Sequence, residues 1–177
     1  MSQQGQETKK ILVSPEQLDK RIVELGEQIT AAYQGRKLIM VGVLNGAFIF
    51  AADLCRVIDI EVEIDFIRVA SYGASTESSG SIRLLMEPKL DMTGKDVLIV
   101  EDIVDTGTTM AWLQEHFNQS GARSVKICSL IDKLERRAVS ISVDYVGFTL
   151  DQGFLVGYGL DCAERFRNLP GIYSLDS

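Results

Sequence analysis

The sequence predicts an α/β fold, with a mostly parallel, twisted β-sheet flanked by helices. Runs of apolar, β-favouring residues without alternation occur at 38–44, 97–100 and 124–131, which is typical of strands covered on both faces. An apolar helical segment at 47–56 separates the first two runs. After the second run, apolar residues recur at three- and four-residue steps over 110–117, which indicates another helix. Strands that alternate with helices form parallel sheets.

The N-terminal part predicts a short strand over 11–13, followed by a helix. Ser14 is a good N-cap, Pro15 suits the first helical position, and Gln17 stands where a capping box requires it. Gly35 ends this helix. Its apolar face is predicted to consist of Leu18, Ile22, Leu25, Ile29 and Ala32.

Further strands are predicted on both sides of the centre. Residues 60–70 are rich in Ile, Val and Phe, which indicates a long strand, and 82–86 indicate the returning strand of a hairpin. The small polar residues at 71–80 have the composition of a mobile loop. A strand over 145–150 is followed by a turn and a second apolar segment at 154–161.

Length and composition limit the class of protein. The 177 residues suit one domain, and 46% apolar with 24% charged residues is ordinary for a globular protein. A net charge of −7 argues against nucleic acid as the main partner. There is no run of 18 apolar residues and no apolar signal core near the N-terminus, so we expect a cytoplasmic protein without a membrane partner.

The cysteines and the histidine indicate no metal centre of their own. Cys55, Cys128 and Cys162 are odd in number and widely separated, so we interpret them as reduced thiols. His116 is the single histidine, which argues against a His-based triad or a His-rich metal site. It stands among apolar residues of a predicted helix, and we expect it to be structural.

The chemically most informative stretch follows the strand at 97–100. That strand is predicted to end at Glu101 and Asp102, and Asp105 opens a loop with the composition of a helix cap. A helix N-terminus offers backbone N–H groups and a partial positive charge, which suits a phosphate. The loop residues that would surround it are Thr106, Gly107, Thr108 and Thr109.

The two adjacent carboxylates suit a different partner from the loop. Glu101 and Asp102 are acceptors for the hydroxyl groups of a polyol, or for Mg²⁺ carried by a polyphosphate. A phosphate site beside a site for hydroxyls and metal fits a phosphorylated sugar.

The run Val-Glu-Asp-Ile-Val-Asp-Thr-Gly-Thr-Thr at 100–109 resembles the signature of the type I phosphoribosyltransferases, in particular the hypoxanthine-guanine branch. The resemblance covers about residues 11–169. It implies a single domain over 1–177, with a core at about 36–150 and a small hood from about 11–14 and 151–177. It also implies a flexible active-site loop at about 71–81.

The resemblance implies a purine salvage enzyme that acts on 5-phosphoribosyl-1-pyrophosphate and a 6-oxopurine. The phosphoribosyl group would pass to N9 of hypoxanthine or guanine, with Mg²⁺ as cofactor. Asp105 would act as general base near N7 of the purine, Glu101 and Asp102 would hold the ribose hydroxyls and Mg²⁺, and Thr106 to Thr109 would bind the 5′-phosphate. A homodimer or homotetramer is expected.

Pyrophosphate would lie against a second loop. The resemblance assigns Leu44, Asn45 and Gly46 to this loop, with a peptide bond at Leu44-Asn45 that can be cis, and adds Arg167 as a pyrophosphate ligand. The branch often has a basic residue where this chain has Asn45, so backbone amides would carry the binding here. Asp161 matches a position that holds Mg²⁺.

The remaining carried-over residues concern the base and the loop. Lys133 matches a lysine that donates to O6 of the purine, which favours 6-oxopurines over adenine. Phe154 matches an aromatic residue that stacks on the purine, and the backbone of Leu155 would contact the ring edge. Ser71 and Tyr72 match a pair on the loop that closes over the reacting centre and excludes water.

Two alternatives stay open at this point. A regulatory protein on the same fold could bind the sugar-pyrophosphate as a signal and contact RNA or DNA, although the negative charge argues against it. A transferase with another base preference, such as xanthine or guanine alone, would differ only by contacts near Leu155 and Asp161.

Overall fold

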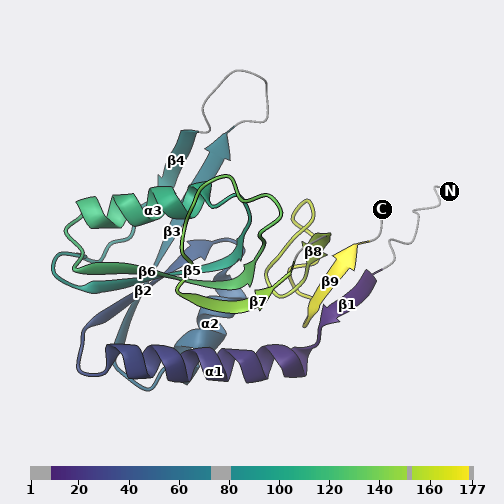
Figure 1. Cartoon of the computed structure of the whole chain (residues 1–177), viewed down its shortest axis with the longest axis horizontal. Coiled ribbons are helices and arrows are strands. Elements are labelled where there is room, and N and C mark those ends of the chain that lie inside the picture. The colour runs from purple at the N-terminus through teal and green to yellow at the C-terminus, as the bar shows by residue number, and fades with distance from the viewer. Residues whose placement is uncertain (1–8, 73–80, 151–152, 176–177) are drawn as a thin grey trace.

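A six-stranded sheet forms the body of the computed structural model, which describes residues 9–72, 81–150 and 153–175 (Figure 1). Strands β3, β2, β5, β6 and β7 pair in parallel, and β4 adds an antiparallel edge. The mostly parallel sheet predicted from the sequence is therefore confirmed. In spatial order the strands are β4 (Ser81–Met86), β3 (Val62–Tyr72), β2 (Leu38–Leu44), β5 (Asp96–Val104), β6 (Ser124–Asp132) and β7 (Tyr145–Thr149).

Helices cover both faces of this sheet, as Figure 1 shows. On one face lie α1 (Pro15–Tyr33) and α2 (Phe48–Val57), and on the other lies α3 (Thr108–Gln119). The central strands β2 and β5 are buried on both sides because each contributes to two hydrophobic clusters. This burial explains why their sequences are continuously apolar rather than alternating.

The first helix forms largely as its sequence predicts. Ser14 Oγ accepts from the amide of Gln17, and the Gln17 side chain accepts from the Ser14 amide, so the capping box is confirmed. The apolar face ends at Tyr33 rather than at Ala32, which is exposed. The prediction for Ala32 was wrong by one position, because a step of four from Ile29 places Tyr33 toward the core.

Two predicted boundaries are corrected by backbone pairing. Strand β5 does not end at the paired carboxylates, because Glu101 pairs with Ser129 and Val104 with Asp132 of β6. Strand β3 continues to Tyr72, where antiparallel pairing with β4 accommodates polar residues that composition assigns to a loop. Residues 71, 72 and 81 of the expected loop at 71–81 therefore belong to strands, and the rest of that stretch, 73–80, lies outside the described residues.

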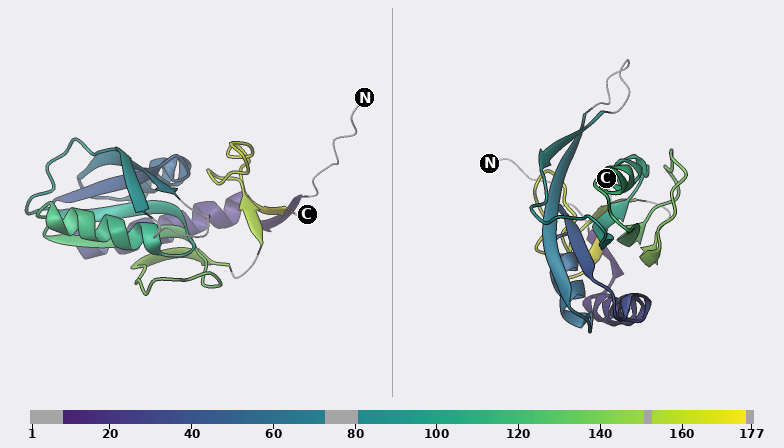
Figure 2. Two further views of the ribbon diagram at one scale, coloured as in Figure 1. Left: turned by 90° about the horizontal axis from the view of Figure 1, so that it is seen from above. Right: turned by 90° about the vertical axis from the view of Figure 1, so that its left-hand side faces the viewer.

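A second sheet joins the two ends of the described chain. Strand β9 (Ile172–Leu175) lies between β1 (Lys9–Val13) and β8 (Phe154–Val156), and both pairings are antiparallel. Figure 2 shows this small sheet at one end of the molecule, beside the start of α1. It adjoins the carboxyl ends of the central strands, because Lys133 after β6 donates to the carbonyl of Gly153 before β8.

Candidate active site

The candidate site lies where the connections of the large sheet change direction. Strands β2 and β5 are neighbours, but the chain proceeds from β2 to β3 on one side and from β5 to β6 on the other. In open α/β sheets, ligands bind at such a switch point, beyond the carboxyl ends of the strands. Here the loops at 44–46 and 105–107 follow those two strand ends.

The N-terminus of α3 has no side-chain cap. Gly107 is the N-cap residue, its φ of 82° lies in the left-handed region, and no side chain forms a cap hydrogen bond there. The loop does lead into the helix, as its composition indicates, but the N-cap is a glycine, and the nearest side-chain contact is the Thr108 amide donating to Thr106 Oγ1 at 3.4 Å. A helix N-terminus without a side-chain cap leaves backbone donors for an anion.

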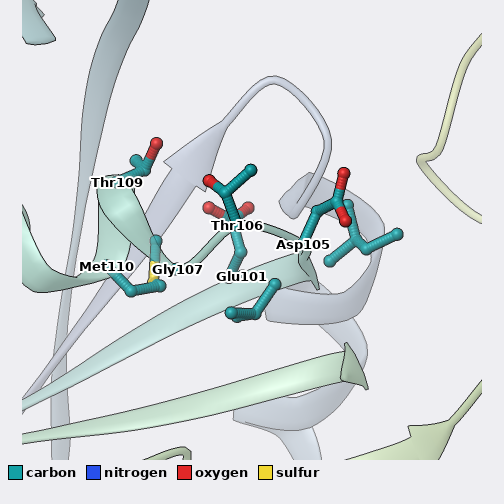
Figure 3. A pocket seen from close by; sticks show the side chains of 8 residues that line it. Glu101, Asp105, Thr106, Gly107, Thr109 and Met110 are labelled. Carbon is teal, nitrogen blue, oxygen red and sulfur yellow. The ribbon is translucent and has the colours of Figure 1, made fainter. Parts of the chain in front are cut away.

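A cavity opens at this helix N-terminus (Figure 3). Figure 3 shows the side-chain oxygens of Asp105, Thr106 and Thr109 pointing to the same side of the strand end. Hydroxyl and amide donors therefore share one cavity with carboxylates. Its lining consists of Glu101, Ile103, Val104, Asp105, Thr106, Gly107, Thr109 and Met110.

Glu101 and Asp102 are both buried in β5, side by side. Burial, and then the negative charge of Asp102, raise the pKa of Glu101 well above its ordinary value. Glu101 Oε1 accepts from the Asp102 amide at 3.0 Å, which compensates only in part. A buried pair of like charges of this kind is suited to a cation or to hydroxyl donors.

Asp105 presents one unpaired oxygen. Its Oδ1 atom is buried and has no hydrogen-bond partner, whereas Oδ2 lies 3.3 Å from Nη1 of the exposed Arg136. A buried acceptor without a donor is energetically costly unless a ligand supplies one. Asp105 is therefore suited to accept a hydrogen bond or a proton from a bound molecule.

The loop after β2 packs tightly against the neighbouring segments. The Leu44-Asn45 peptide bond is cis, as the resemblance implies. A Cβ placed on Gly46 would lie 2.0 Å from Oδ2 of Asp102, and one on Gly159 would lie 2.1 Å from the Gly46 carbonyl oxygen. Both glycines are required for this close approach, which brings a C-terminal segment against the loop.

Arg167 and Asp161 lie together in that C-terminal segment. Arg167 Nη1 donates to the Gly159 carbonyl at 2.7 Å, and Nη2 lies 2.9 Å from both Asp161 Oδ1 and Glu164 Oε2. Asp161 Oδ2 accepts from the Glu164 amide. The predicted metal ligand and the predicted pyrophosphate ligand are thus paired with each other.

Lys133 and Phe154 differ in exposure. The Lys133 side chain is buried, with only 8% of the residue exposed, and its Nζ donates to the Gly153 carbonyl at 3.2 Å. Phe154 is 55% exposed, whereas Leu155 beside it is buried. A solvated lysine and a core phenylalanine, the ordinary roles of these residue types, are therefore both excluded.

The structure leaves the predicted roles of Ser71 and Tyr72 untested. Ser71 and Tyr72 belong to β3 by their backbone pairing, and their side chains lie outside the described detail. Among the described residues, no cluster of three or more His, Cys, Asp or Glu side chains is placed to hold a metal. His116 stacks on Trp112, with ring centroids 5.1 Å apart.

Two arginines near the cavity were missed by sequence reasoning. Arg136 contacts the Asp105 carboxylate, and Arg137 contacts the backbone below the loop at 105–107. They stand in a charged stretch after Lys133 that reads as a solvated surface turn. The signal that could have marked them is the pair of adjacent arginines in the charged stretch that follows the strand ending at Asp132.

Comparison with known proteins first defines the class. The phosphoribosyl transferase domain family matches residues 11–163 of this chain. That range contains the whole six-stranded sheet, the three helices and the cavity at the end of β5.

Individual relatives define the branch. The hypoxanthine-guanine phosphoribosyltransferase of Bacillus subtilis is 46% identical over 163 residues, covering 92% of this chain and 91% of that protein. A crystal structure of a hypoxanthine-guanine phosphoribosyltransferase from Bacillus anthracis is 44% identical, with a TM-score of 0.91, and covers 97% of this chain and all of the other. The chain therefore belongs to the hypoxanthine-guanine phosphoribosyltransferase family.

A longer relative contains the same domain. The bifunctional protein TilS/HprT of Listeria innocua is 47% identical over 163 residues, which are 92% of this chain but only 25% of that protein. The present chain thus spans about a quarter of this relative. No helix within the described residues is both long and apolar enough to cross a membrane.

Proposed function

We propose that the protein transfers the 5-phosphoribosyl group from phosphoribosyl pyrophosphate to N9 of hypoxanthine or guanine, releasing pyrophosphate. The products are IMP or GMP. As a member of this family the chain is a transferase of purine salvage.

The observation that carries the proposal is the pairing of two opposite sites at the end of β5. The helix N-terminus at Gly107 offers amides and the hydroxyls of Thr106, Thr108 and Thr109 to a 5′-phosphate. Directly before it, Glu101 offers a buried carboxylate on the same cavity. A ribose 5-phosphate has the matching order of groups, with hydroxyls a few atoms from the phosphate.

The base would lie between Asp105, Lys133 and Phe154. Lys133 is held at the end of β6 by its bond to Gly153, where its remaining donors can reach O6 of a purine. Phe154 exposes a ring on which a purine can stack, and the buried Leu155 holds that strand in the small sheet. We therefore propose that this small sheet is the hood over the base.

Asp105 is assigned the role of accepting the proton that the purine loses. As the bond between C1′ and the pyrophosphate oxygen breaks, C1′ gains oxocarbenium character and N9 of the purine supplies the electron pair of the new bond. The purine must then lose a proton, and Asp105 Oδ1 is a buried acceptor that lacks a donor in the free protein. The pyrophosphate leaves with the electron pair of the broken bond.

The departing pyrophosphate needs its charge neutralised. We assign this to the amides of the 44–46 loop, to Arg167 and to Mg²⁺. The buried pair Glu101 and Asp102 fits such a cation, which proteins bind through one or two carboxylates and the oxygens of the substrate. Asp161 would first have to exchange Arg167 for the metal. When bound, Mg²⁺ supplies positive charge to the pyrophosphate oxygens.

The environment of the enzyme is also proposed. All three cysteines are free, which fits a reducing cytoplasm.

The large apolar side chains of Phe48, Ile64, Leu85 and Met86 are 40–47% exposed on α2, β3 and β4, which supports a homodimer or homotetramer. Ser71 and Tyr72 are assigned to closure over the reacting centre by family resemblance.

The experiment is turnover of phosphoribosyl pyrophosphate with Mg²⁺ and, separately, hypoxanthine, guanine, xanthine and adenine, followed by chromatography of the nucleotides. We expect fast formation of IMP or GMP and little AMP. A folded protein that binds phosphoribosyl pyrophosphate but forms no nucleotide from any base would contradict the proposal and favour a regulatory role.

A further inference from the structure

The connection between β6 and β7 supports the loop at 105–107 from below. Its backbone donates three hydrogen bonds to two carbonyls of this segment: Lys133 N to Val104 O at 2.9 Å, and Ala138 N and Val139 N to Thr106 O at 2.9 and 3.1 Å. The carbonyl between them, that of Asp105, accepts from a side chain instead. The donor is Nε of Arg137, at 3.1 Å.

The Arg137 guanidinium joins two strand ends. Its Nη2 donates to the carbonyls of Val104 at 3.4 Å and Lys133 at 3.1 Å, and it forms an ion pair with Asp132. The side chain is only 16% exposed. One partly buried cation thus holds the backbone of Asp105 after β5 and of Lys133 after β6.

Peptide geometry relates these bonds to the cavity. In a planar trans peptide the N–H points opposite to the C=O. Because the Asp105 carbonyl is turned toward Arg137, the amide of Thr106 is turned away from Arg137. The bonds of Ala138 and Val139 to the Thr106 carbonyl orient the Gly107 amide in the same way. Both amides belong to residues that line the cavity.

We propose that Arg137 is a positioning residue that aims the phosphate-binding amides at the substrate and holds Asp105 and Lys133 in register across β5 and β6. The inference rests on the proposed function, because it assumes that the loop binds the 5′-phosphate. Arg137 acts through the backbone and lies beneath the loop, where a Cβ added to Gly107 would lie 3.1 Å from its Cδ.

The role depends on the shape of the guanidinium as well as on its charge. Lysine keeps the charge but has no donor at the position of Nε, so Arg137→Lys removes the bond to the Asp105 carbonyl. Arg21 provides a matched control. It donates from Nε to Gly147 O and from Nη2 to Val146 O, pairs with Glu24, and lies on α1, away from the cavity.

The experiment compares Arg137→Lys and Arg21→Lys with the unchanged protein in steady-state kinetics, thermal unfolding and inhibition by ribose 5-phosphate. For Arg137→Lys we expect the inhibition constant of ribose 5-phosphate and the KM for phosphoribosyl pyrophosphate to rise about tenfold, equivalent to about 1.4 kcal/mol. The kcat should fall as well, because small displacements at reacting groups are costly. Arg21→Lys should change each value less than twofold.

Other outcomes separate the two proposals. If both variants lose thermal stability alike and neither changes the kinetics of the folded enzyme, Arg137 is only structural and the inference fails. If the unchanged protein forms no nucleotide, the proposed function fails instead. Should Arg137→Lys not fold, Asp132→Asn keeps the guanidinium and weakens its anchor; an unchanged inhibition constant for ribose 5-phosphate in that variant would equally overturn the inference.

Discussion

Buried carboxylates at the two ends of β5 differ in whether they have hydrogen-bond donors and positive charges as partners. At the start of the strand, Asp96 is fully buried and accepts hydrogen bonds from Arg123 and Ser124, with Arg36 at 3.6 Å. At the other end, Glu101 lies beside a second carboxylate, and Asp105 has a buried oxygen without a donor. Between Asp96 and Asp105 the chain therefore passes from a carboxylate whose charge is paired to one with a buried oxygen that has no donor.

The pKa directions express this difference. The hydrogen bonds from Arg123, opposed by burial, lower the pKa of Asp96, whereas burial and the charge of Asp102 raise that of Glu101. The first arrangement stabilises the fold at neutral pH and the second destabilises it. Unfavourable burial of carboxylates without partners is retained at sites that bind ligands, where the substrate supplies the missing hydrogen-bond donors or positive charge. Asp96 thus stabilises the fold, whereas we propose that Glu101 and Asp105 bind the substrate.

The largest effect is expected for Asp105→Asn. The amide cannot accept the purine proton, so kcat should fall by about 10²-fold or more while binding of phosphoribosyl pyrophosphate persists. Stopped-flow or steady-state kinetics together with a binding isotherm measure both quantities. An unchanged kcat would remove Asp105 from the chemical step and leave the functional end of β5 without its proton acceptor.

Lys133→Gln should relax the choice of base. The variant would lose the donor that we propose binds O6 of a 6-oxopurine and that adenine cannot use, and a hydrogen bond from a charged group is worth about 10- to 100-fold in the ratio of kcat/KM values. The measurement is kcat/KM for hypoxanthine and for adenine. If the preference for 6-oxopurines is undiminished, Lys133 does not select the base through a hydrogen bond to O6.

Asp96→Asn tests the stabilising end of the strand. Loss of the charged acceptor should lower the free energy of unfolding by about 2 kcal/mol at pH 7. Because the folded pKa of Asp96 lies below its ordinary value of 3.8, its stabilisation is complete above that pH and is lost as pH falls through the folded pKa. Urea unfolding at pH 7 and near pH 3 should show the difference shrinking in acid, and the exposed Asp59→Asn serves as control.

Glu101→Gln should have the smallest effect on stability, and the opposite sign. The folded pKa is raised, so the ionised side chain costs stability as pH rises above its ordinary value of 4.5. The variant should therefore gain about 1 kcal/mol at neutral pH, with weaker binding of phosphoribosyl pyrophosphate. Thermal unfolding from pH 5 to 8, with the exposed Glu27→Gln as control, tests this. A loss of stability would show that the two ends of β5 do not differ as described.

Local patterns determined much of the fold. The capping box at Ser14 and Gln17, the unbroken apolar strands, and the Thr-Gly-Thr-Thr loop before α3 all depend on neighbours in sequence, and each is recognisable there. Boundaries were less certain. Glu101 and Asp102 look like a strand end because charged residues rarely occupy central strands, yet pairing with β6 continues from Glu101 to Val104.

The roles of several side chains were decided only by the tertiary structure. Without the family resemblance, the sequence did not decide whether Lys133 is a solvated lysine or a ligand of the base, or whether Phe154 belongs to the core or stacks on the purine. It gave no indication of a role for Arg137. Their burial and partners depend on contacts between the large sheet, the small sheet and the β6–β7 connection. The sequence by itself determined the order in which the carboxylates and the phosphate-binding loop follow one another at the end of β5, since those residues are adjacent in the chain. Only folding brought the carbonyls of Asp105 and Lys133 to one guanidinium, because Asp105 and Arg137 are 32 residues apart in the chain.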